Sequence, residues 1–152
     1  RIYNLDPEKT RKRVLELAKM LNCDHVLETQ LRRLSLGERM KMEIIGALLH
    51  EPRVLFLDEP TIGLDIVAQE NIRNFLAQYV KEKSQTVILT SHYMDDIAKL
   101  ADTLLLISHG NIVYQGTVKE FVANSNSKLA ENEEVDFEEV IRRFLETESR
   151  IR

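Results

Sequence analysis

Two adjacent acids, Asp58 and Glu59, directly follow the apolar run at 54–57. Carboxylates beside a buried strand are costly unless a cation or a hydrogen-bond donor meets them. One could hold magnesium, which takes oxygen ligands and keeps several waters, and the other could orient or deprotonate an attacking water. For the pair alone, hydrated acids at a strand end are the simpler interpretation. The Pro60-Thr61 and Gly63-Leu64-Asp65 segments that follow favour a site.

A second group, Leu34-Ser35-Leu36-Gly37-Glu38, has the spacing of a capping box, since Ser35 and Glu38 stand three positions apart. A helix start of this kind also offers free backbone amides and the positive end of the helix dipole to a phosphate. Gly37 would permit close approach. Taken alone, these residues support a plain helix start and a phosphate site about equally.

His92 follows the apolar run at 86–90. A histidine in this place can donate a hydrogen bond to a phosphate oxygen or to a water. A single histidine is more often a surface residue, and this is our interpretation of His25, His50 and His109. The scatter of the four histidines gives no metal-ligand spacing.

Hydrophobic patterns predict the elements that position these residues. A strand buried on both faces is expected at 54–57, a second buried strand at 86–90 and a third strand at 104–107, the last with a hairpin partner at 112–114. Helices are expected after Asp6-Pro7 and at 38–50, 66–83, 94–101 and, beyond a polar linker at 124–134, at 137–145. The alternation of strands and helices implies an α/β fold with a largely parallel sheet, in which ligands bind beyond the carboxyl ends of the strands.

The composition narrows the class of protein. The 152 residues are 43% hydrophobic and 30% charged with a net charge of −4, which describes a globular chain and offers no basic surface for a nucleic-acid backbone. The single cysteine, Cys23, excludes an internal disulfide and a cysteine-built zinc site. No apolar stretch approaches the roughly 18 residues of a membrane span, and the first residues lack the apolar core of a secretory signal. We therefore expect a chain that is cytosolic or that docks to something that is not.

In their order along the chain, Leu34-Ser35-Leu36-Gly37-Glu38, Leu57-Asp58-Glu59-Pro60, Gly63-Leu64-Asp65 and Leu89-Thr90-Ser91-His92 resemble the C-terminal half of an ABC-type ATPase. The resemblance covers about residues 5–118. It implies an α/β fold, a partial P-loop NTPase-like parallel sheet with flanking helices, plus a helical subdomain at the N-terminus. The implied parts are a helical signature portion at 1–50, the C-terminal part of the ATPase core at 51–118, and a linker with an amphipathic helix at 119–152.

The resemblance also implies roles for individual residues. Asp58 ends the Walker B strand and helps hold magnesium, Glu59 is the catalytic glutamate that polarises the attacking water, and His92 is the switch histidine that contacts the γ-phosphate of ATP. The signature motif, which binds ATP held by the opposite subunit, is matched by Ser35, Leu36, Gly37 and Glu38. Asp65 matches the aspartate of the loop that communicates between the two sites.

From the same resemblance come the expected partners. ATP and magnesium are the cofactors, and a second ATPase subunit, identical or not, completes a head-to-tail dimer. A separate transmembrane permease places the subunit on the inner face of the cell membrane, and no nucleic acid is expected. The strings at 36–43 and 90–97 are similar to the branch that powers drug-exporter and related efflux permeases.

The chain departs from the family pattern in three respects. Leu36 stands where glycine is commonest, and Glu38 replaces the usual glutamine. We expect the Glu38 carboxylate to act as a first-turn helix acid that is turned away from the nucleotide. The chain also contains no Gly-Lys pair, so the phosphate-cradling loop Gly-x-x-x-x-Gly-Lys-Ser/Thr (Walker A) is missing. The isolated chain is therefore expected to be inactive.

Three explanations of the missing loop remain open. The favoured one is a fragment of a complete ATP-hydrolysing subunit that couples hydrolysis to transport, here efflux. The second is a degenerate subunit that lends its signature motif to a competent partner. The third is a soluble ABC ATPase acting on ribosomes or DNA, against which the acidic composition and the exporter-like strings count.

Overall fold

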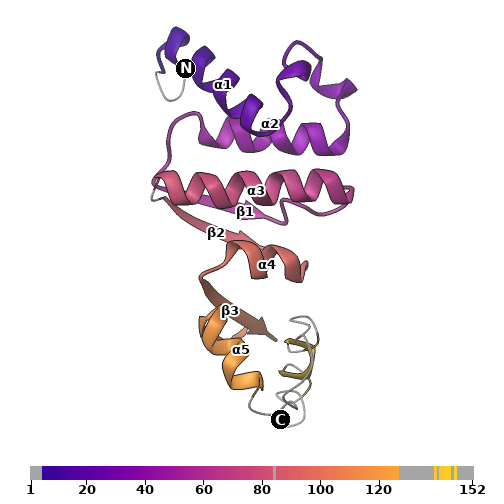
Figure 1. Ribbon diagram of the computed structural model, residues 1–152, viewed down its shortest axis with the longest axis vertical. Coiled ribbons are helices and arrows are strands. Elements are labelled where there is room, and N and C mark those ends of the chain that lie inside the picture. Colours follow the sequence, from indigo (N-terminus) through magenta and orange to yellow (C-terminus); the bar gives the residue numbers. More distant parts are fainter. Residues whose placement is uncertain (1–4, 84, 127–138, 140, 145, 147–152) are drawn as a thin grey trace. The chain divides into compact units, whose positions relative to one another are not determined.

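The computed structural model describes residues 5–83, 85–126, 139, 141–144 and 146 (Figure 1). The chain forms two compact units that divide between His92 and Tyr93. No helix within the described ranges is both long and apolar enough to cross a membrane. The predicted three-part division at residues 50 and 118 stays a prediction.

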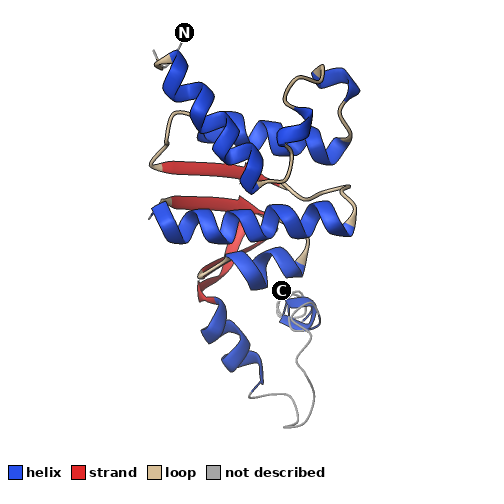
Figure 2. Cartoon of the chain, turned by 45° about the horizontal axis from the view of Figure 1, so that its top comes forward, coloured by secondary structure: helices blue, strands red, loops and turns tan. Residues whose placement is uncertain are grey.

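The first unit combines helices with a two-stranded parallel sheet (Figure 2). Its elements in chain order are α1 (Pro7–Met20), the 3-10 turns η1 (Asp24–Val26) and η2 (Leu31–Arg33), α2 (Leu36–Leu48), β1 (Val54–Asp58), α3 (Ile66–Lys83) and β2 (Thr86–Thr90). The strands pair in register from Val54 with Thr86 to Asp58 with Thr90. The predicted α/β fold with flanking helices is thus confirmed. α2 begins two residues earlier than predicted, because Ser35 caps it.

The helices of the first unit share one apolar core. α1 begins as predicted, with Asp6 accepting a hydrogen bond from the Lys9 amide at 2.8 Å. α1 contacts α2, and α2 contacts α3. The residues at the centre of this core are almost fully buried: Leu17, Leu21, Ile44, Leu48, Ile72, Leu76 and Tyr79. Burial of this apolar surface is what holds the sheet and the helix starts in fixed positions.

The sheet of the first unit is buried on one face only. Burial alternates along β1, so that Leu55 and Leu57 are buried whereas Val54 and Phe56 are exposed. Phe56 is 72% exposed. The expectation of burial on both faces is therefore wrong for β1 in this structure, where buried and exposed side chains alternate along the strand.

The second unit contains α4 (Met94–Leu100), β3 (Thr103–Ser108), β4 (Asn111–Thr117) and α5 (Val118–Asn126). β3 and β4 form an antiparallel hairpin, as predicted. Its turn uses His109 and Gly110, both at positive φ. The expectation that the run at 104–107 extends the parallel sheet is wrong here, because β3 pairs with β4 in a separate sheet.

The core of the second unit consists of Leu104, Phe121 and Ile141, against which Tyr114 and Phe144 pack. Packing of the predicted amphipathic stripe on a core is confirmed for Ile141 and Phe144, while residues 137, 138, 140 and 145 lie outside the described residues. α5 extends over 124–126, where a linker was expected. The rest of that linker, 127–134, also lies outside the described residues.

Candidate functional site

Asp58 lies where β1 ends, directly beside Thr90 of β2. The parallel register makes these two residues partners. The Thr90 hydroxyl donates a hydrogen bond to Oδ1 of Asp58 at 2.5 Å. Asp58 is exposed, so one oxygen of its carboxylate is held by the neighbouring strand at a surface that a ligand can reach.

The Glu59 carboxylate meets His92 just beyond the end of β2. The His92 backbone amide donates to Oε2 of Glu59 at 3.2 Å, and Nε2 of the ring lies 3.3 Å from Oε1. The Glu59 side chain is 19% exposed, whereas that of His92 is 86% exposed. The carboxylate is therefore oriented by two contacts from His92, whose ring remains accessible.

The backbone at Glu59 explains how two consecutive acids can both meet β2. Glu59 has φ +48°, in the left-handed region that non-glycine residues adopt rarely. The alternation of side chains along β1 therefore ends at Asp58. In the structure one hydroxyl, that of Thr90, contacts the side chain of Asp58 and the amide of Glu59.

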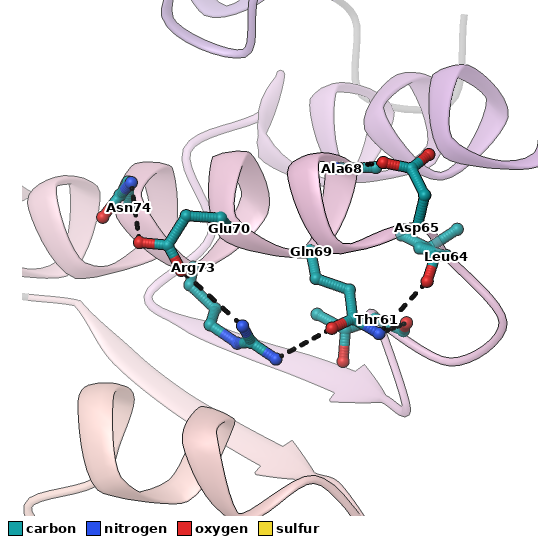
Figure 3. A network of polar contacts seen from close by, with 8 residues as sticks. All are labelled: Thr61, Leu64, Asp65, Ala68, Gln69, Glu70, Arg73 and Asn74. Atoms are coloured by element: carbon teal, nitrogen blue, oxygen red, sulfur yellow. Dashed lines mark hydrogen bonds and ion pairs between the residues drawn. The ribbon is translucent and has the colours of Figure 1, made fainter.

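The loop after Glu59 is held by side chains of α3 (Figure 3). The Gln69 amide donates to the carbonyl oxygens of Thr61 at 3.4 Å and Leu64 at 3.2 Å. The Arg73 guanidinium, itself buried, donates to Oε1 of Gln69 at 3.1 Å. Asp65 caps α3 by accepting from the Ala68 amide at 2.9 Å. The Asp65 side chain therefore stabilises the start of α3, and this is independent of the expected role in communication between two ATP sites.

The predicted capping box at the start of α2 is confirmed. Oε2 of Glu38 accepts from the Ser35 amide and from the Ser35 hydroxyl, both at 2.8 Å, and the Glu38 amide donates to Oγ of Ser35 at 3.2 Å. These contacts lower the pKa of the Glu38 carboxyl, the backbone hydrogen bond from Ser35 being the largest cause and the hydroxyl the second. Glu38 is thus turned back onto Ser35, in agreement with a first-turn helix acid.

Gly37 has a packing role that the sequence did not reveal. A Cβ atom at Gly37 would lie 3.1 Å from Cβ of Ala68 in α3, and a Cβ at Gly63 would lie 3.4 Å from the Leu36 side chain. The start of α2 therefore packs closely against the loop and the first turn that follow Glu59. The Leu36 side chain takes part in this contact and is 52% exposed.

The predicted site residues thus form two groups. Asp58, Glu59 and His92 meet at the carboxyl ends of β1 and β2. The start of α2 meets the Gly63–Ala68 segment instead. Convergence of both groups on one triphosphate shared between two chains stays a prediction.

The expected magnesium fits this arrangement. Within the described part of the chain no group of three His, Cys, Asp or Glu side chains is arranged for a metal. Magnesium does not need such a cage, because it is usually bound by one or two carboxylates, waters and substrate phosphates. Asp58, exposed and fixed at one oxygen, is the carboxylate that would supply this contact.

Replacing Glu38 by glutamine tests the first-turn assignment. Glutamine can keep the capping geometry without the charge, so ATP hydrolysis by an assembled subunit should stay within about a few-fold of the parent value. Because the folded-state pKa of Glu38 is below its ordinary value of 4.5, its stabilising effect is present above that pH and lost as the pH falls through the lower value. Denaturant unfolding at a series of pH values should show that Glu38→Gln loses less unfolding free energy in acid than the parent does. Equal losses in the two proteins, or a collapse of ATP hydrolysis in the variant, would contradict the first-turn assignment of Glu38.

The known proteins to which this chain is similar include ATP-binding proteins of several transporters. Residues 3–62 match the family model described as ABC transporter. The chain is 43% identical over 96 residues to the energy-coupling factor transporter ATP-binding protein EcfA2 of Clostridioides difficile, covering 63% of this chain and 33% of the relative. It is 30% identical over 128 residues to the ABC transporter ATP-binding protein NatA of Bacillus subtilis, covering 84% and 52%. The molybdenum import ATP-binding protein ModC of Pseudomonas savastanoi is 36% identical over 115 residues, covering 76% and 32%.

Solved structures match over much of the chain. CbiO1 of Clostridium perfringens, described as part of the ABC transporter complex cbiONQ, superposes with a TM-score of 0.65 at 31% identity, covering 83% of this chain and 53% of that one. The ATP-binding cassette MJ0796, solved as a dimer with ADP and Pi, superposes with a TM-score of 0.66 at 25% identity, covering 75% and 49%. The chain thus spans about half or less of the length of the relatives and structures compared.

Proposed function

We propose that this chain, which is homologous to ATP-binding subunits of ABC transporters, supplies the Walker B, signature and switch-histidine part of such a subunit. One observation carries the proposal: Glu59 and His92 contact each other at the sheet edge where Asp58 ends β1. Two acids and an accessible histidine at the carboxyl ends of parallel strands are placed to act on a bound ligand.

The proposed reaction is the hydrolysis of ATP. Transfer of a phosphoryl group to water depends on positioning and on charge stabilisation more than on covalent chemistry. Glu59 would accept a hydrogen bond from the attacking water and orient it, and the exposed His92 ring would donate to the γ-phosphate. Asp58 would hold magnesium, which when bound neutralises charge on the phosphates. The contact between Glu59 and His92 supports this division of roles, because it holds the two side chains together.

A second subunit and a permease are part of the proposal. The capped start of α2, with Ser35 and Gly37, would approach ATP held by the opposite subunit of a head-to-tail dimer. The dimeric structure of MJ0796 and the description of CbiO1 as part of a transporter complex support this assembly. Attachment to a permease would place the subunit at the inner face of the membrane.

The direction of transport stays a prediction. The strings at 36–43 and 90–97 favour the exporter-like branch. One relative of comparable similarity, ModC, is named for molybdenum import, so the similarity to relatives does not favour efflux. The proposal therefore rests on ATP hydrolysis that drives transport, and an efflux role is its finer form.

Measuring phosphate release tests the proposal that the chain supplies only part of an ATP-hydrolysing site. The purified 152-residue chain, given ATP and magnesium, should show no turnover, because its sequence holds no Gly-Lys loop to cradle the phosphates. The same chain joined to a segment that carries such a loop should hydrolyse ATP. ATP turnover by the chain alone that disappears in Glu59→Gln would contradict the proposal that the chain holds only part of the site. A joined chain that binds ATP without hydrolysing it would favour the degenerate subunit.

A further inference from the structure

We propose that Thr90 is a positioning residue of the hydrolytic site, whose single hydroxyl fixes Asp58 and Glu59 relative to each other. The inference rests on the proposed function, because it assigns Thr90 a task in that reaction. Thr90 need not touch ATP or water itself. It acts through the two acids, from the strand next to theirs.

The hydrogen bonds at Thr90 have a complementary pattern. Its hydroxyl donates to Oδ1 of Asp58 at 2.5 Å and accepts from the Glu59 amide at 3.1 Å. The same amide also points to the Thr90 carbonyl oxygen, again at 3.1 Å. A hydroxyl has one proton to donate and lone pairs to accept with. Both capacities are used here, one on each acid.

Each acid has a freedom that Thr90 removes. A carboxylate can rotate about its terminal bond, whose torsional preference is broad, and the bond to Oδ1 of Asp58 restricts that rotation. Glu59 lies in the left-handed region at φ +48°, a conformation that costs a non-glycine residue energy unless its surroundings hold it. The side chain and the carbonyl of Thr90 both hold the Glu59 amide, so the strained turn is fixed where the catalytic carboxylate begins.

Threonine suits this task better than other small polar residues. Its branched Cβ restricts the side chain to few rotamers and favours a strand. The hydroxyl is therefore presented to β1 at little entropic cost. His92, two residues further on, donates its amide to Oε2 of Glu59. The end of β2 thus holds both acids, through Thr90 and through His92.

Three variants separate the hydroxyl from the strand. Thr90→Val keeps the branched shape and removes the hydroxyl, whereas Thr90→Ser keeps the hydroxyl and removes the methyl group. Thr86→Val is the matched control, because Thr86 lies on the same strand and the same face but pairs with Val54 instead of an acid. Each variant is made in the assembled ATPase that contains this chain, and kcat and KM for ATP are measured with magnesium.

Thr90→Val should lower kcat about ten- to a hundredfold, the size of effect that small misplacements of catalytic groups produce, with KM for ATP within about twofold. Thr90→Ser should restore most of kcat, and Thr86→Val should equal the parent. A parental kcat in Thr90→Val would overturn the inference, as would a loss in Thr90→Ser as large as that in Thr90→Val. Circular dichroism confirms folding, and Thr90→Ala repeats the test if valine distorts the strand.

Glu59→Gln, measured beside these variants, distinguishes a failure of the proposed function from a failure of the positioning role of Thr90. If Glu59→Gln hydrolyses ATP within a few-fold of the parent, the catalytic role that the proposed function gives to Glu59 fails. If Glu59→Gln is inactive while Thr90→Val keeps the parental kcat, only the positioning role of Thr90 fails.

Discussion

Replacing Glu59 by glutamine should lower ATP hydrolysis by an assembled subunit about a hundred- to ten-thousandfold, the contribution typical of a general base or water-orienting group. The amide has nearly the shape of the carboxylate and can still accept from the His92 amide, which lies 3.2 Å from Oε2 in the parent. It has no charge with which to polarise the attacking water. ATP binding should persist, so ATP-bound dimers should accumulate.

Phosphate release and size-exclusion chromatography with ATP measure the two halves of this result. Glu28→Gln is the matched control, since Glu28 is an exposed acid in the same unit and outside the site. It should leave both readouts unchanged. Hydrolysis by Glu59→Gln within a few-fold of the parent would show that the carboxylate does not act on the water.

Truncating Tyr79 to alanine should cost the first unit about 3–5 kcal/mol of unfolding free energy, the range for large aromatic side chains in a core. Tyr79 is 1% exposed, and its ring stacks on Phe75 with centroids 5.6 Å apart. The Arg13 guanidinium of α1 donates to its hydroxyl at 3.2 Å and lies 5.7 Å from the ring centroid. The truncation thus removes core packing and the contact from α1 together.

Tyr79→Phe isolates the polar part of this contact. It keeps the ring and removes the hydroxyl, so it should cost only about 1 kcal/mol, the net worth of one hydrogen bond. Urea unfolding of the two variants and the parent gives the comparison. Equal losses in alanine and phenylalanine would mean that the hydroxyl, and not the ring, stabilises the packing of α1 on α3.

Hydrophobic patterns predicted the elements of the first unit well. The run at 54–57 and the periodic residues of 66–83 correspond to β1 and α3. Because parallel strands end at one edge of a sheet, the sequence also predicted that the acids and His92 would come together. The capping box at Ser35 was readable because it depends only on residue type and spacing.

Features that depend on tertiary contacts were missed. An apolar run does not say which strand it pairs with, and β3 pairs with β4 instead of extending the parallel sheet. The left-handed turn at Glu59 has no sequence signal, since glycine is the residue that marks such turns. Because that turn was not predicted, the sequence also did not predict that the Thr90 hydroxyl bridges Asp58 and Glu59.

The close approach of Gly37 to Ala68 has a mechanical consequence. Backbone and a methyl group meet there, with no long side chain between them to change rotamer. A displacement of the first turn of α2 would therefore press on the first turn of α3, which Asp65 caps and from which Gln69 holds the carbonyl oxygen of Leu64. Close packing thus joins the helix start at Ser35 to the loop that follows Glu59.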